Sequence, residues 1–165
     1  MKKEKHLPLY GVGPIYGIAV VALTAAGIVL SALGLLPSGR YARFFVPVNC
    51  LAALLIVLGV TLWIKAVIQS KIDDNIQKNH LVTTGVYAWA RNPIYSAFLF
   101  VCTGAILLAH NLWLLNLPPI YWVFLTVLMK HTEEKWLLAQ YGAEYKDYCK
   151  KTNRCIPWFP QGEIK

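Results

Sequence analysis

The residues of this chain best suited to chemistry form two short polar groups, each beside a long apolar run. The first group is Arg91-Asn92-Pro93-x-Tyr95. Asn followed by Pro is typical of a helix start, where free backbone N–H groups and the positive end of the helix dipole attract anions. Arg91 adds a permanent charge and a planar donor fork that fits a carboxylate or a phosphate. This group predicts an anion site. The alternative is that Asn92 only caps the helix and Arg91 only reaches lipid headgroups.

The second group contains Lys130, Glu133 and Glu134. Lys130 precedes Glu134 by one helical turn, and beside a bilayer such a pair would interact more strongly than in water. The alternative is a solvated acidic helix end. Three tyrosines at helical spacing suit either a cavity lining or an interfacial aromatic belt: Tyr141, Tyr145 and Tyr148.

Long uncharged runs position these groups. The runs are Ile15–Leu36, Phe44–Ile64, Ile94–Ala109 and Leu112–Met129. About 20 helical residues cross a hydrocarbon core roughly 30 Å thick, so the first two runs (within residues 15–64) are predicted transmembrane helices. The last two runs predict a tight helical hairpin that either crosses or re-enters. Together they predict an all-α, polytopic integral membrane protein with about four transmembrane helices and a single membrane domain, residues 1–165.

Basic residues predict the orientation of these helices. Of the 16 Lys and Arg residues, all but Arg40 and Arg43 lie before the first run, between the second and third, or after the fourth. By the positive-inside rule, both termini and both polar groups face the cytoplasm, where they are expected to close over a common cavity. The net charge of +8 is assigned to contact with membrane lipids, and no nucleic-acid partner is predicted.

Smaller signals complete the expected organisation. Residues 131–134 should extend the last membrane helix, Gly142 should break it, and Glu144–Lys151 should form another helix. The stretch from Gly11 to Pro14 is expected to be a flexible lead-in to the first run. Gly27 and Ser31 predict close helix packing. The four Cys and four His residues have no common zinc spacing, so no metal site is predicted.

The order of the polar residues forms a longer pattern. It reads L-V-x-x-G-x-Y-x-x-x-R-N-P-x-Y, then a helical hairpin, then E-E-x-x-L-x-x-x-Y-G-x-E-Y-x-x-Y and K-T-x-R-x-x-P. Over residues 78–160 this order resembles the isoprenylcysteine carboxyl methyltransferase family and, more distantly, the phospholipid N-methyltransferases.

The resemblance implies a membrane methyltransferase that uses S-adenosyl-L-methionine and takes a lipophilic or prenylated acceptor from the bilayer. Its catalytic residues would be Glu134, Lys130 and Arg91. The cofactor would be bound by His80, Leu81, Val82, Gly85, Tyr87, Asn92, Tyr95, Glu133, Glu134 and Tyr145. Two positions depart from the family pattern. Asn92 replaces the commoner His and does not titrate near neutral pH. Lys130 stands where Arg is usual and lacks the bidentate fork.

Three other functions remain open at the level of sequence. With an amine acceptor the enzyme would be a phospholipid N-methyltransferase, and Glu134 would be the proton acceptor. An NADPH-dependent steroid-reductase-like enzyme would share the R-x-P-x-Y pattern. A non-enzymatic small membrane protein would be expected to carry polar residues inside its spans, whereas the four runs contain few polar residues and no charged one.

Overall fold

The computed structural model describes residues 11–37, 39, 45–69 and 81–159 of the chain. The described residues form helices and turns, with no β-strand among them. The elements are α1 (Gly13–Ala32), α2 (Phe45–Ile64), η2 (Lys65–Gln69), η3 (Gly85–Ala88), α4 (Pro93–Leu108), η4 (Leu112–Asn116), α5 (Leu117–His131), α6 (Glu133–Tyr141) and α7 (Ala143–Lys151).

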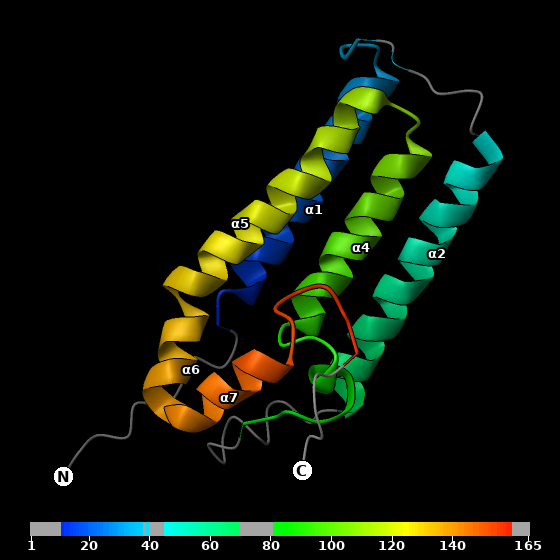
Figure 1. Ribbon diagram of the computed structural model, residues 1–165. Coiled ribbons are helices and arrows are strands. Elements are labelled where there is room, and N and C mark those ends of the chain that lie inside the picture. Colours follow the sequence, from blue (N-terminus) through cyan, green and yellow to red (C-terminus); the bar gives the residue numbers. More distant parts are fainter. Residues whose placement is uncertain (1–10, 38, 40–44, 70–80, 160–165) are drawn as a thin grey trace.

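The long helices form an antiparallel bundle with α4 at its centre (Figure 1). Helix α2 packs on one side of α4, while α1 and α5 pack on the other. One end of the bundle collects the starts of α1 and α4 and the ends of α2 and α5, together with α6 and α7. We call this the polar end, because both polar groups identified in the sequence lie there.

Three helical segments are long and apolar enough to cross a membrane: Gly13–Ala32, Phe45–Ile68 and Leu112–Tyr141. Helix α4 is apolar but shorter. The predicted all-α integral membrane class is therefore confirmed, with three to four helices of membrane-spanning character. The predicted hairpin is also present, because α4 and α5 lie antiparallel and are joined through residues 109–116.

Small residues allow the helices to approach closely. A Cβ atom at Gly27 would lie 2.9 Å from Leu114 Cδ2, which confirms the close packing expected there. The tightest contact joins α2 and α4, where Cβ atoms at Gly59 and Gly104 would lie 2.9 and 2.8 Å from backbone carbonyl oxygens of the facing helix. The α2–α4 contact was not singled out from the sequence, because single glycines in an apolar run do not reveal their partner.

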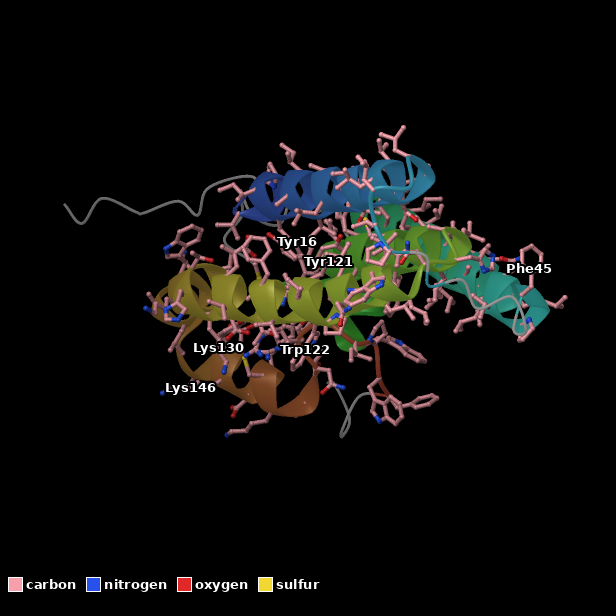
Figure 2. All side chains as sticks on the ribbon, turned by 90° about the horizontal axis from the view of Figure 1, so that it is seen from above. Tyr16, Phe45, Tyr121, Trp122, Lys130 and Lys146 are labelled. Carbon is pink, nitrogen blue, oxygen red and sulfur yellow. The ribbon has the colours of Figure 1, made fainter. Side chains whose placement is uncertain are left out.

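Aromatic side chains fill the space between α1 and α5. Tyr16 and Tyr121 are almost fully buried there, and Tyr121 shares a hydrogen bond of 2.9 Å with Thr24 Oγ1 (Figure 2). The far end of the bundle is tied by Asn111, whose Nδ2 donates to Ser31 Oγ at 2.9 Å. These contacts fix the helices that carry the polar end.

Candidate functional site

Glu134, at the start of α6, is the centre of an ionic cluster. Arg154 donates to both of its carboxylate oxygens, from Nε at 2.6 Å and from Nη2 at 3.1 Å. Arg91 Nη2 lies 3.5 Å from Glu134 Oε1. Only 10% of the Arg91 side chain and 17% of the Glu134 side chain are exposed, so these charges interact with little screening by water. The cluster brings together two residues predicted as catalytic, Arg91 and Glu134.

A backbone pairing carries Arg154 to this position. The segment after α7 runs alongside the residues that precede α4, with a parallel bridge between Ala90 and Asn153. The N–H of Arg91 donates to the Asn153 carbonyl at 2.8 Å, and the N–H of Asn92 donates to the Arg154 carbonyl at 3.1 Å. This pairing places both arginines beside the same carboxylate.

Arg91 has further donor capacity. Its Nη1 donates to the Cys149 sulfur on α7. Its Nε is buried and has no hydrogen-bond partner among the described residues. An unpaired buried N–H of a cation is costly unless a ligand completes it. The geometry of Arg91 therefore fits the anion site predicted from the sequence.

The Asn92 side chain forms a hydrogen bond other than the expected helix cap. It occupies the N-cap position of α4 without a side-chain capping bond, and its Nδ2 donates instead to the Arg154 carbonyl at 3.1 Å. Its own carbonyl accepts from the Ser96 hydroxyl at 3.0 Å. The predicted helix start is correct, but the Asn92 side chain holds the C-terminal segment.

Glu133 points away from the arginine cluster. It accepts hydrogen bonds from the Tyr95 hydroxyl and, at 2.8 Å, from the backbone N–H of Val12. Gly11 has φ of +50°, and a Cβ atom there would lie 2.1 Å from Glu133 Oε1. The lead-in to α1 is therefore attached to the start of α6, and α1 itself begins at Gly13, inside the stretch expected to be flexible. Two predicted cofactor residues, Tyr95 and Glu133, contact each other in this attachment of α1.

Lys130 does not join the cluster. The helical segment continues past Lys130 to Tyr141, as expected, but it is distorted at Thr132, which has φ of −125° and ψ of −91° and separates α5 from α6. Lys130 is exposed in the last turn of α5 and makes none of the ion pairs found in the described part of the chain. The expected pairing of Lys130 with Glu134 is wrong, because Arg91 and Arg154 occupy that carboxylate. Figure 2 shows Lys130 at the same end of the molecule as Lys146 of α7.

The remaining predicted cofactor residues lie near η3 and α7. Tyr145 and Leu81 are buried in a small cluster with Tyr148, whose hydroxyl donates to the Tyr87 carbonyl at 2.6 Å. The expected break at Gly142 is present, so Tyr145 and Tyr148 belong to α7 and Tyr141 to α6. Because Tyr145 and Tyr148 are buried, they do not form an interfacial belt.

Two further predicted residues, Val82 and Gly85, follow Leu81 closely in the sequence. Val82 is half-buried, and Gly85 starts η3 with φ of +63° in open space. His80 lies outside the described residues.

Electrostatics at the polar end follow from this packing. The hydrogen bond to Glu134 raises the pKa of the Arg154 guanidinium, which stays charged. Burial raises the pKa of the neighbouring Cys155 thiol to about 12, so that thiol is neutral at physiological pH. Burial also raises the pKa of the Tyr148 phenol. The charges near the cluster are therefore those of Arg91, Arg154 and Glu134.

Arg154 was not among the residues predicted for the site. The signal that could have identified it was the K-T-x-R-x-x-P pattern, which places a basic residue in an otherwise irregular segment. Cys149 carried no such signal, because its contact with Arg91 depends on how α7 packs.

The fold and the cluster define this molecule as an all-helical integral membrane protein with a largely buried ionic site at one end of its bundle. A sequence profile of the phospholipid methyltransferase family matches residues 48–144, which include most of α2 and all of α4, α5 and α6. The chain belongs to this family.

Individual relatives carry a more specific name. The chain is 37% identical over 79 residues to the protein-S-isoprenylcysteine O-methyltransferase of Saccharomyces cerevisiae, covering 47% of this chain and 33% of that protein. The corresponding proteins of Schizosaccharomyces pombe and Xenopus laevis are 35% and 30% identical, over 50% and 52% of this chain and 36% and 30% of their own lengths. The chain thus spans about a third of the length of these relatives. No solved structure matches it.

Proposed function

We propose that this protein is an S-adenosyl-L-methionine-dependent methyltransferase that acts at the cytoplasmic face of the membrane on a lipid-like acceptor. The first expected reaction is carboxyl O-methylation of an isoprenylcysteine-type substrate. The observation that carries the proposal is the largely buried Arg91–Glu134–Arg154 cluster, whose side chains are 10%, 17% and 22% exposed. The cluster joins the segment before α4 to the segments around α6 and α7. Because the chain belongs to a methyltransferase family, we assign the cluster to binding of the methyl donor.

The residues present fit this cofactor. The methionyl part of the cofactor carries a carboxylate and an ammonium group, and the cluster offers a cation with an uncommitted buried N–H beside an acid. We assign Arg91 to the carboxylate and Glu134 to the ammonium group. The cofactor, when bound, supplies a methyl group activated by a positively charged sulfur. Further contacts are proposed from Leu81, Val82, Gly85, Tyr87, Asn92, Tyr145 and, outside the described residues, His80. Tyr95 and Glu133, which the resemblance also implies, contact each other at the start of α1 and are proposed to act by holding that helix in place.

The protein's part in a carboxylate reaction is orientation and exclusion of water. A carboxylate acceptor is already deprotonated near neutral pH, so the chain needs no general base. Aligning the acceptor at a partly desolvated membrane face lowers the barrier by removing translational freedom and competing water. Lys130, exposed at the end of α5, is proposed to hold the acceptor carboxylate in place of the commoner Arg.

A second candidate is N-methylation of a phospholipid amine, which the name of the matching family profile favours. The amine would have to be neutral before it could attack. Glu134 is the proposed proton acceptor, and one of its oxygens would then have to be released by Arg154.

The test combines cofactor binding with product chemistry. Purified protein in detergent is titrated with S-adenosylhomocysteine and with NADPH in a calorimeter, alongside Arg91→Ala, Glu134→Ala and the control Glu144→Ala on the exposed side of α7. We expect saturable binding of S-adenosylhomocysteine, lost in the first two variants and kept in the control. Binding of NADPH instead would support the reductase, and binding of neither by folded protein would support a non-enzymatic role.

Product chemistry then separates the acceptors. The protein is supplied with labelled S-adenosylmethionine and either a prenylated cysteine with a free carboxyl group or vesicles of phosphatidylethanolamine. A methyl ester releases labelled methanol in base, whereas an N-methyl group does not. Base-labile label on the prenylated cysteine would support O-methylation, and base-stable label on the phospholipid would support the second candidate.

A further inference from the structure

Three exposed aromatic side chains lie at the polar end, in the two segments that also carry Arg91 and Arg154. Trp158 and Phe159 are 61% and 70% exposed, and Trp89 is 44% exposed. The Phe159 ring centroid lies 5.2 Å from that of Trp89 and 6.4 Å from that of Trp158. We call Trp89, Trp158 and Phe159 the aromatic triad. Large exposed aromatic groups in contact with each other mark an interaction surface rather than ordinary solvated surface.

The backbone holds the triad in place. The N–H of Trp158 donates to the Trp89 carbonyl at 3.1 Å, so the chain turns back after the bridge between Ala90 and Asn153 and is attached a second time. On the α7 side, the Thr152 hydroxyl donates to the Ala88 carbonyl at 3.4 Å. The exposure of these rings is therefore a feature of a paired segment and not of a loose chain end.

The same segment has an inner and an outer face. Arg154 reaches inward to Glu134, and Cys155 is 2% exposed, with its carbonyl accepting from the Ser96 hydroxyl of α4. Ile156, Trp158 and Phe159 are exposed. Whatever binds the outer face therefore also holds the residues that position Arg154.

The position of the triad indicates what covers it. Trp89 follows η3, and η3 contacts η2 at the end of the apolar segment Phe45–Ile68. The end of that segment also exposes apolar side chains: Trp63, Ile64, Val67 and Ile68. The triad thus continues the surface that a membrane-spanning segment presents to lipid. Trp is enriched at the boundary between lipid and water, where its ring is buried and its N–H stays hydrated.

Charge on the adjoining helix supports the same partner. Helix α7 leads into the paired segment and exposes Lys146, Lys150 and Lys151. Lys150 pairs with Asp147 at 2.8 Å and Glu144 is also exposed, so three lysines against two acids leave α7 with a net positive charge. Anionic lipid headgroups attract such basic residues at a membrane surface.

We propose that the aromatic triad inserts into the lipid–water boundary on the side of the membrane that holds the ionic cluster, and so anchors the Arg154 segment to the bilayer. This inference does not depend on methyl transfer, and its test measures depth in the membrane and not activity.

The test uses tryptophan quenching in reconstituted vesicles. The chain has six Trp residues, so the signal of the triad is taken as the difference between the wild-type protein and the Trp89→Phe/Trp158→Phe variant. Phe keeps an apolar ring at both exposed positions, so the variant is expected to fold. Vesicles contain phosphatidylcholine brominated either near the headgroup or near the chain end, and acrylamide is the aqueous quencher. Trp122→Phe is the matched control, because Trp122 is 45% exposed within the membrane-spanning segment Leu112–Tyr141.

We expect the triad difference signal to be quenched at least twofold more by shallow bromines than by deep ones, and little by acrylamide. The Trp122 difference signal should favour deeper bromines. Strong quenching of the triad signal by acrylamide with no effect of bromine would overturn the proposal, because the rings would lie in water. Protection from both quenchers would also overturn it, because the rings would then be covered by protein, such as a second copy of the chain. If the double variant does not fold, the single Trp158→Phe variant supplies the same comparison.

Discussion

Replacing Glu134 by Gln tests whether the ionic cluster organises the polar end. The substitution keeps the size of the side chain and one acceptor oxygen but removes the negative charge. Arg91 and Arg154 would then lie beside each other without the carboxylate that compensates them. Because only 10% and 22% of their side chains are exposed, water cannot fully replace the lost charge.

The size of the effect follows from the contacts. Hydrogen bonds to a charged group contribute roughly 1.5–3 kcal/mol and neutral ones roughly 0.5–1.5 kcal/mol. Of the two bonds from Arg154, of 2.6 and 3.1 Å, one keeps its charged donor but faces a neutral oxygen, and the other is lost because two donors would face each other. We expect the free energy of unfolding to fall by about 2–3 kcal/mol, a roughly 30- to 150-fold change in the ratio of folded to unfolded protein.

The assay is chemical unfolding in detergent followed by tryptophan fluorescence, with S-adenosylhomocysteine affinity measured on the same preparations. Glu144→Gln is the control, since Glu144 is exposed on α7 and belongs to the same half of the chain. The affinity of the Glu134→Gln protein should fall at least tenfold, the effect of a lost contact of about 1.4 kcal/mol. If Glu134→Gln unfolds and binds like Glu144→Gln, the cluster organises neither the fold nor a cofactor site, and our reasoning fails.

Three further outcomes follow from single residues. Gly11→Ala should destabilise the protein more than Gly85→Ala in thermal unfolding: both have positive φ, which costs about 1–2 kcal/mol, but only the first meets a carboxylate at 2.1 Å. Equal losses would show that Glu133 moves aside freely. Lys130→Gln should leave unfolding and S-adenosylhomocysteine affinity unchanged while raising KM for a carboxylate acceptor roughly tenfold; a stability loss like that of Glu134→Gln would reveal a buried role. Cys155, whose pKa is raised by burial from 9.0 to about 12, should react with iodoacetamide about a thousandfold more slowly in folded than in unfolded protein at pH 8, because the thiolate reacts. Its rate should rise tenfold per pH unit toward pH 12, and a folded rate already at its plateau near pH 9 would contradict the burial.

The sequence was sufficient for the helices and for the class of the fold. The uncharged runs long enough to cross a bilayer predicted α1 and α2 close to their observed bounds, and Asn92-Pro93 correctly predicted the start of α4. Gly142 separated α6 from α7 as expected, because its φ of +54° suits glycine. These features depend on local chemistry, which a sequence displays directly.

Contacts within the polar end were harder to predict, because they depend on how distant segments meet. Lys130 and Glu134 have the spacing of a helical ion pair. The helix is distorted between them at Thr132, however, and the Glu134 carboxylate binds Arg154 from the C-terminal segment instead. The role of Asn92 likewise depended on a carbonyl that lies in the C-terminal segment. Spacing along one helix carries no information about a segment that pairs with it in space.

The adjacent acids Glu133 and Glu134 bind different partners, although they are neighbours in the sequence. Successive residues of an α-helix are about 100° apart, so two neighbouring carboxylates at the start of α6 cannot serve the same partner. One meets Tyr95 and the start of α1, and the other meets the arginines. Glu133→Gln should therefore lower stability while S-adenosylhomocysteine affinity stays within about threefold of wild type, since a change of less than about 0.7 kcal/mol is expected from a group outside the ionic cluster. A tenfold or greater loss of affinity, with little loss of stability, would instead assign Glu133 to the cofactor, as the family resemblance implies.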